Sequence, residues 1–217
     1  MKMSRSLFYL SLLIVSIACQ DSEDETIQSN FIQDFRVGQK IHYVQLYGFN
    51  EIDSIQTRNS GDTLELDVLE IGENYAQLSE RYTLGSNSVK AIEYLKEPHT
   101  SKWFIEGDSL LIIKDSVNWV DSNYLTSKNK LILNGNSISE LKLGVTLLSY
   151  IPKTDGYYYV KDCTIMHQYY ERLDVFADMS PLSYDGYGEV IFFSIKSGIV
   201  RVIRIYPRGG IISWDRM

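Results

Sequence analysis

The sequence predicts an all-β protein, an antiparallel meander curled into a barrel, a half-barrel or a two-sheet sandwich. Three observations carry this prediction. Apolar and polar residues alternate along much of the chain after residue 36, turn-forming segments separate the alternating runs, and helical periodicity is scarce. One-sided alternation implies antiparallel strands with one face on a core and the other in water.

The first strongly predicted hairpin lies between residues 62 and 82. DTLELDVLEI, residues 62–71, places leucines and a valine on one face and mostly acidic residues on the other. Gly72-Glu73-Asn74 has the composition of a turn, and YAQLSERY, residues 75–82, follows it. A β-hairpin is therefore expected here.

Two further hairpins are predicted on the same grounds. KWFIEGDSLLIIK, residues 102–114, is divided by Gly107-Asp108, and EVIFFSIKSGIVRVIRIY, residues 189–206, is divided by Lys196-Ser197-Gly198. Shorter apolar runs bring the expected total to ten to twelve strands: RVGQKIHYVQLYGF, VKAIEYL, NKLILN, GVTLLSYIP, GYYYVKDCTI and YERLDVFA. Little helix is expected beyond the N-terminal segment, with one turn at residues 137–141.

Composition and charge indicate one globular domain, expected at residues 31–217. Apolar residues make up 44% of the 217 and aromatic residues 12%, which is typical of a chain that buries a core. Lys2 and Arg5 are the only charged residues before Cys19, so the rest of the chain carries a formal charge of −9. An acidic domain repels phosphate backbones, and nucleic acid is not an expected partner.

Residues 1–18, MKMSRSLFYLSLLIVSIA, have a short basic start and an apolar core from Leu7 to Ile17. Eleven helical residues reach about 17 Å, well short of the roughly 30 Å hydrocarbon core of a bilayer. The segment is therefore interpreted as a signal peptide and not as a permanent membrane span.

The sequence of Ala18 followed by Cys19 at the end of this core resembles the lipobox of bacterial lipoproteins. The resemblance covers residues 1–19 and departs from the family at Ser16, where Leu is more common. It implies cleavage before Cys19, a diacylglyceryl group on the cysteine sulfur and acylation of the new amino terminus. The alternative is an ordinary secretory signal cut nearby, which would leave Cys19 as a thiol.

Two or three acyl chains on Cys19 would anchor the domain to a membrane, because each buried CH₂ contributes about 0.8 kcal/mol. Residues 19–30 begin with an acidic, apolar-free stretch and are expected to form a flexible tether. Gln20 in place of Asp resembles the sorting signal for the outer membrane. SEDE, residues 22–25, resembles a signal for export to the cell surface, although a plain spacer is equally compatible, so the leaflet stays open.

Cys163 has no intramolecular partner once Cys19 is acylated. A single cysteine in an exported protein is either a reactive thiol or a buried inert one, and the inert state is expected.

No motif predicts a catalytic residue, a cofactor or a metal site. The three histidines lie far apart, and neither a metal-ligand spacing nor a nucleophile elbow is present. The protein is therefore more readily interpreted as a non-enzymatic module than as an enzyme, although a hydrolase site assembled by folding stays open.

The candidate ligand-binding residues are three tyrosines and two arginines. Tyr157, Tyr159 and Tyr169 could stack on sugars or on a partner protein, although β-propensity explains them too. Arg201 and Arg204, three positions apart in a strand, should point to opposite faces. An inward arginine could bind a carboxylate or phosphate, or could pair with an internal acid such as Asp174.

These patterns together favour a lipoprotein of the cell envelope, anchored at the outer membrane through Cys19. Its all-β domain is expected to be a binding or envelope-interaction module, with a glycan or a protein as partner. The alternatives are a lipid-handling half-barrel carrier, which would need a wide apolar cavity, and an envelope hydrolase. An immunity or inhibitor role is also compatible with the acidic domain.

Overall fold

The computed structural model describes residues 31–51, 54–85, 98–115, 125–133, 139–141, 152, 154–179, 188–206 and 210–217. These residues form one short 3-10 helix and twelve strands. In chain order the elements are η1 Phe31–Asp34, β1 Lys40–Glu51, β2 Ser54–Ile71, β3 Tyr75–Thr83, β4 His99–Glu106, β5 Ser109–Lys114, β6 Lys130–Ile132, β7 Ser139–Glu140, β8 Gly156–Ile165, β9 Gln168–Asp178, β10 Gly188–Ser194, β11 Gly198–Ile205 and β12 Gly210–Arg216.

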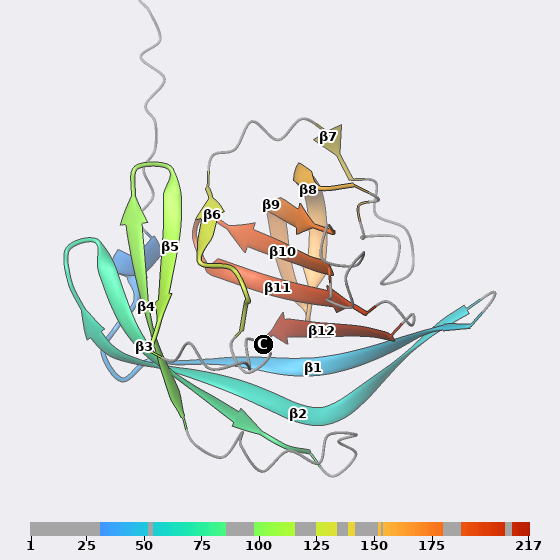
Figure 1. The fold of residues 1–217 in the computed structure, drawn as a ribbon, viewed down its shortest axis with the longest axis horizontal. Coiled ribbons are helices and arrows are strands. Elements are labelled where there is room, and N and C mark those ends of the chain that lie inside the picture. The colour runs from blue at the N-terminus through green and yellow to red at the C-terminus, as the bar shows by residue number, and fades with distance from the viewer. Residues whose placement is uncertain are drawn as a thin grey trace, which may run out of the picture.

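All twelve strands belong to one sheet, in the order β6-β5-β4-β3-β2-β1-β12-β11-β10-β9-β8-β7. The first strand pairs with the last at the centre, so the two edges, β6 and β7, come from the middle of the sequence. Every pair is antiparallel except β7 with β8. The edges do not pair with each other, and the predicted all-β meander is confirmed as an open, strongly curled sheet (Figure 1).

The three predicted hairpins are confirmed. β2 pairs with β3, β4 with β5 and β10 with β11, each across the turn expected from the sequence. In β3 the residues alternate between buried and less buried positions along most of the strand. The buried side chains of β2 to β5 point into the concave side of the sheet, where they meet Trp214 and Phe193 from the other half.

Strands β10 to β12 depart from the expected one-sided pattern. All seven residues of β10 are buried, and so are five consecutive residues of β12. Ile191 and Val202 belong to the concave core, whereas Val190 and Ile203 belong to a second apolar cluster on the opposite face. Because both faces are covered, these strands have continuous apolar runs instead of alternation.

Helix η1 packs its aromatic residues on the concave core. The ring of Phe31 lies edge-on to Phe193 at 5.2 Å and to Trp103 at 6.5 Å. Gly198, at φ 77°, lies beneath Phe31, and a Cβ there would come within 2.9 Å of the ring. The helical turn expected at residues 137–141 is wrong at Ser139–Glu140, which form strand β7.

Several expectations concern residues outside the described part of the chain. These are the signal peptide, Cys19, the tether, the run at residues 89–95 and most of the run at residues 144–152. Within the described residues, no helix has the length and apolar character needed to cross a membrane.

Candidate functional site

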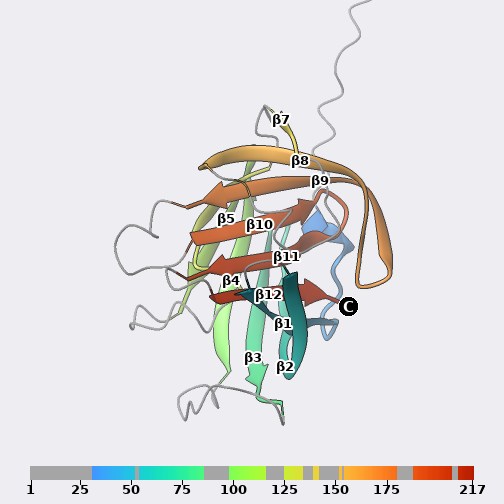
Figure 2. The same cartoon turned by 90° about the vertical axis from the view of Figure 1, so that its right-hand side faces the viewer.

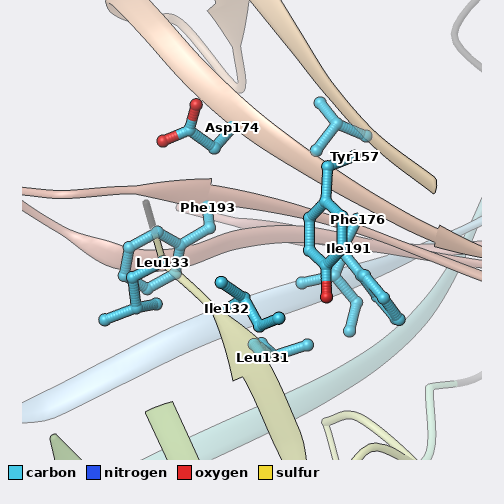
Figure 3. A pocket seen from close by; sticks show the side chains of 9 residues that line it. Leu131, Ile132, Leu133, Tyr157, Asp174, Phe176, Ile191 and Phe193 are labelled. Atoms are coloured by element: carbon cyan, nitrogen blue, oxygen red, sulfur yellow. The ribbon is translucent and has the colours of Figure 1, made fainter. Parts of the chain in front are cut away.

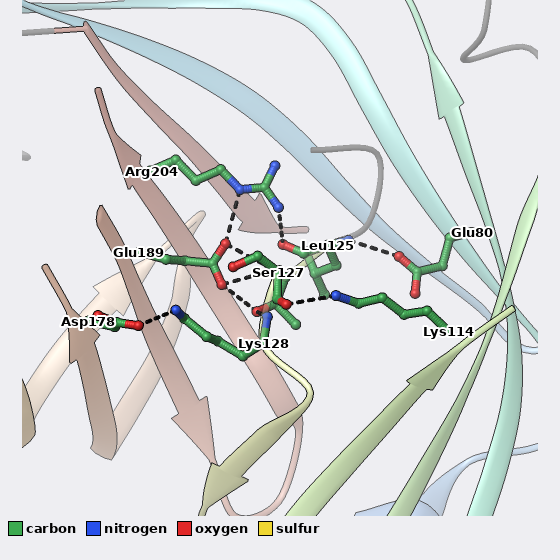
Figure 4. A network of polar contacts seen from close by, with 9 residues as sticks. Glu80, Lys114, Leu125, Ser127, Lys128, Asp178, Glu189 and Arg204 are labelled. Atoms are coloured by element: carbon green, nitrogen blue, oxygen red, sulfur yellow. Dashed lines mark hydrogen bonds and ion pairs between the residues drawn. The ribbon is translucent and has the colours of Figure 1, made fainter. Parts of the chain in front are cut away.

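Residues 125–128, which we call the clasp segment, connect the two halves of the sheet on its concave side (Figure 4). The backbone N–H of Leu125 donates to the Glu80 carboxylate on β3 at 2.8 Å. The carbonyl of Leu125 accepts from Arg204 on β11 at 3.2 Å. One residue thus bonds strands from both halves.

Glu189 on β10 holds the next two residues of the clasp segment. Its carboxylate accepts hydrogen bonds from the Thr126 hydroxyl and from the Ser127 N–H, the latter at 3.1 Å. It also pairs with Arg204 at 3.0 Å, and both side chains are almost fully buried. Lys128 pairs with Asp178 on β9.

Burial shapes the electrostatics of Glu80 more than its neighbours do. Desolvation raises the pKa of this carboxyl above its ordinary value, although hydrogen bonds from Ser101 and Leu125 act in the opposite direction. The positive charges of Lys114 and Arg204 lower the pKa by smaller amounts. A satisfied, buried network of this kind fixes structure and leaves no exposed group for a reaction.

Arg201 and Arg204 lie on opposite faces of β11, as their spacing predicts. Arg201 pairs with Asp215 on β12 through two nitrogens, at 2.8 and 2.5 Å. Arg204 pairs with Glu189 on the concave face. Asp174, the acid suggested by the sequence, instead pairs with Arg172 at 3.0 Å. Both candidate arginines are thus engaged in buried ion pairs.

Tyr157 lies beside the gap in the sheet, where β6 faces β8 to β10 (Figure 3). It lines a small cavity with mostly apolar neighbours, among them Leu131, Phe176 and Phe193, and its ring lies 5.2 Å from that of Phe176. The cavity has a volume of about 10 Å³, enough for about one water molecule. An acyl chain does not fit there.

Tyr159 lies on the more exposed side of the β8–β9 hairpin. The guanidinium of Arg172 lies 4.9 Å from the centre of its ring, and the ammonium of Lys161 lies 5.5 Å from it. Its ring is therefore already stacked with two cations from its own hairpin.

The tip of the β8–β9 hairpin has an unusual backbone. Asp162, Met166 and His167 have φ values of 50°, 48° and 70°, and they are the non-glycine residues with positive φ among those described. Met166 and His167 form the two-residue turn between the strands, where Asn and Gly are the favoured residues. Backbone strain of this kind clusters at functional sites.

The hairpin extends past the ends of β10 to β12 and bends over them (Figure 2). A groove of about 350 Å³, which we call the hairpin groove, lies between the start of β9 and the β10–β11 turn. It is lined by Gln168, Tyr169, Tyr170, Glu171, Arg172, Ser194, Ile195, Lys196 and Ser197. Its volume falls within the range of small-molecule sites.

Tyr169 and Tyr170 face differently, as expected for neighbours in a strand. Tyr169 is 61% exposed and donates to Asp162, whereas Tyr170 is 6% exposed and its hydroxyl has no hydrogen-bond partner among the residues that the structure describes. Burial raises the pKa of Tyr170, and the nearby positive charge of Arg216 lowers it. A buried hydroxyl without a partner is costly, and an acceptor supplied by a ligand would relieve that cost.

Arg216, at the end of β12, reaches the same region. Its guanidinium donates to the carbonyl of Ser197 in the groove wall. No carboxylate lies within ion-pair distance of Arg216 among the residues the structure describes. Arg216 is distant from Tyr170 in the sequence, and its positive charge acts on that residue in the folded chain.

The described residues include no cluster of three or more potential metal ligands. Cys163 is buried, as the expected inert state requires, and burial raises the pKa of its thiol. The hairpin groove brings together an exposed aromatic ring, hydroxyl and amide groups, and cations. This arrangement is suited to binding a polar ligand.

No protein-family model and no curated protein matches the sequence. Several solved structures give distant matches, and three of them are described here. Hypothetical protein CT021 from Chlamydia trachomatis is 12% identical with a TM-score of 0.36, covering 87% of this chain and 90% of that one. A domain described as an outer membrane lipoprotein-sorting protein, from Vibrio parahaemolyticus, is 9% identical with a TM-score of 0.24, covering 87% and 89%. The LolA superfamily protein NE2245 from Nitrosomonas europaea is 9% identical with a TM-score of 0.21, covering 89% and 90%. At these scores the matches carry no argument, and the proposals below depend on the sequence and on the described residues.

Proposed function

We propose that this protein is a membrane-anchored lipoprotein of the bacterial cell envelope whose all-β domain binds a ligand in the hairpin groove without catalysing a reaction. The observation that carries the binding role is the groove itself. It combines an exposed tyrosine ring with a buried hydroxyl that has no partner among the described residues, and it lies next to the strained hairpin tip. The anchor depends on the lipobox-like residues 1–19.

A binding role accounts for the groove better than a hydrolase does. A hydrolase needs at least two ionisable groups within hydrogen-bond reach in an open cleft. The buried carboxylates Glu80, Glu189 and Asp215 are held by clasp or ion-pair contacts. They belong to the structural core and do not line the groove, where Glu171 is the one carboxylate among the described lining residues.

A lipid carrier is favoured less because the concave side of the sheet is filled by side chains. Trp103, Trp214 and Phe31 are each about 1% exposed there. The apolar cavity at the gap has room for about one water molecule. The groove on the outside of the hairpin is the larger of the two described spaces.

The anchor is tested by labelling with radioactive palmitate in the native host. The wild-type chain should incorporate label and partition with outer-membrane fractions, and Cys19→Ser should do neither. Equal labelling of the two chains would refute the lipid anchor, because Cys163 is buried and is present in both.

The binding role is tested by photo-crosslinking in intact cells. A benzoylphenylalanine at Tyr169, 61% exposed, should give a discrete crosslinked product. The same residue at Ile113, 59% exposed on β5, serves as the matched control. Products at both positions, or at neither, would contradict a ligand in the hairpin groove.

A further inference from the structure

The cations of the C-terminal half divide into paired and unpaired groups. Arg172, Arg201 and Arg204 each form an ion pair with a carboxylate. Arg216 and Lys196 form none with the residues described, although both lie at the β10–β11 turn that borders the groove. Two positive charges are therefore left near one wall of a groove whose lining also includes the carboxylate of Glu171.

The Tyr170 hydroxyl adds an uncharged donor at the same place. It is buried and has no partner in the described part of the chain, and the positive charge of Arg216 lowers its pKa. A guanidinium fork and a phenolic O–H together match the two oxygens of a carboxylate. A ligand oxyanion here would accept from the Tyr170 hydroxyl and from the guanidinium of Arg216, which also donates to the Ser197 carbonyl.

The rest of the groove suits a sugar ring. Tyr169 presents an exposed aromatic face, and Gln168, Ser194 and Ser197 supply amide and hydroxyl groups. Flat aromatic faces stack on sugar rings, while polar side chains bond the hydroxyls. The formal charge of −9 disfavours a densely charged polyanion and is compatible with a ligand carrying one or two charges.

We infer that the hairpin groove binds an acidic saccharide, with the sugar carboxylate held by Arg216, Tyr170 and Lys196 and the ring stacked on Tyr169. This inference rests on the proposed binding function and names the ligand class of the same groove. Arg216 and Tyr170 are thus the specificity-determining residues, because they separate an acidic sugar from its neutral counterpart.

The test is calorimetric titration of the full chain in detergent with D-glucuronate, D-glucose and N-acetyl-L-alanine. The wild-type protein should bind glucuronate about tenfold or more tightly than either other probe, as expected when a charged group gains hydrogen bonds. Equal binding of glucuronate and glucose would overturn the carboxylate site. Equal binding of N-acetyl-L-alanine would overturn the sugar assignment.

Variants separate this inference from the broader function. Arg216→Gln and Tyr170→Phe should each weaken glucuronate binding by roughly tenfold and leave glucose binding unchanged. Arg81→Gln removes the same charge from an exposed position on β3 and should change neither glucuronate binding nor glucose binding. If Arg216→Gln does not fold, Tyr170→Phe, which keeps the ring and removes only the hydroxyl, decides the outcome. An effect no larger than that of Arg81→Gln would overturn the inference. A crosslink at position 169 without glucuronate binding would refute the acidic saccharide as ligand and leave the binding role of the groove standing. If neither the crosslink nor glucuronate binding is found, both hypotheses are refuted.

Discussion

The clasp segment predicts that removing one charge from the Glu189–Arg204 pair strongly destabilises the fold. Glu189→Leu would leave the buried Arg204 guanidinium without its carboxylate, although the Leu125 carbonyl would still accept from it. Breaking a buried ion pair from one side costs about 3–5 kcal/mol. For a chain of this length that corresponds to a loss of roughly 6–20 °C in melting temperature.

Replacing both partners should cost much less than replacing one. Glu189→Leu with Arg204→Met removes both charges, and such replacements are often close to neutral. The Ser127 N–H and the Thr126 hydroxyl would still lose their acceptor. We therefore expect a residual cost of about 1–3 kcal/mol for the double variant.

The assay is urea unfolding followed by tryptophan fluorescence, because Trp103 and Trp214 are buried in the shared core. Arg172→Met is the control, since Arg172 is 54% exposed in its pair with Asp174 and should contribute less than about 1 kcal/mol. A Glu189→Leu effect as small as this control would refute the structural role of the clasp segment. So would a double variant as unstable as the single one.

Three further predictions follow from single residues. Burial raises the pKa of Glu80 above its ordinary value of 4.5, so the folded chain keeps a proton that the unfolded chain loses, and stability falls as pH rises above about 4.5. Glu80→Gln should therefore unfold at a higher urea concentration than wild type near pH 7, and at the same concentration below about pH 4. Equal urea midpoints for the variant and the wild type at both pH values would contradict this. His167→Gly relieves the strain of a non-glycine residue at φ 70° in the turn and should raise the free energy of unfolding by about 1 kcal/mol. A lower melting temperature would show instead that the histidine side chain stabilises the turn. The thiol of Cys163 is 4% exposed, so Ellman's reagent should titrate it slowly in the native chain and rapidly in urea; equal rates would exclude a buried thiol.

The hairpins were predictable because their signals are local. Residues 62–82 contain an alternating run, a turn and a second alternating run, and each needs no information from elsewhere in the chain. The pairing of β1 with β12 was not predictable, since it joins Tyr43 to Arg216 across most of the sequence. Strand order in a sheet depends on such long-range contacts, which leave no local pattern.

The continuous apolar runs of β10 to β12 show how burial changes a sequence pattern. A strand with one wet face alternates, but Val190 and Ile191 lie in two different cores on opposite faces. The continuous apolar run EVIFFS therefore indicates a strand that is buried on both faces of the sheet. This signal was present in the sequence, although it could equally be produced by a strand in a sandwich.

The candidate site was only partly predictable. The spacing of Arg201 and Arg204 correctly predicts opposite faces, but their partners Asp215 and Glu189 come from neighbouring strands. The possible ligand role of the five candidate residues stays a prediction. Arg216 and Tyr170 were harder to select because their proximity depends on how the β8–β9 hairpin bends, which involves a positive φ at Asp162.

The open sheet explains why the ligand is expected outside the curl and not within it. The edges β6 and β7 have three and two residues, which limits the unpaired backbone that each presents. The clasp segment bonds β3 to β10 and β11 across the concave side, where a carrier would need open space. Because each of its buried polar contacts requires a fixed position, widening the interior would leave several charged groups unsatisfied. The hairpin groove makes no such demand, since none of the residues that line it takes part in the described clasp contacts.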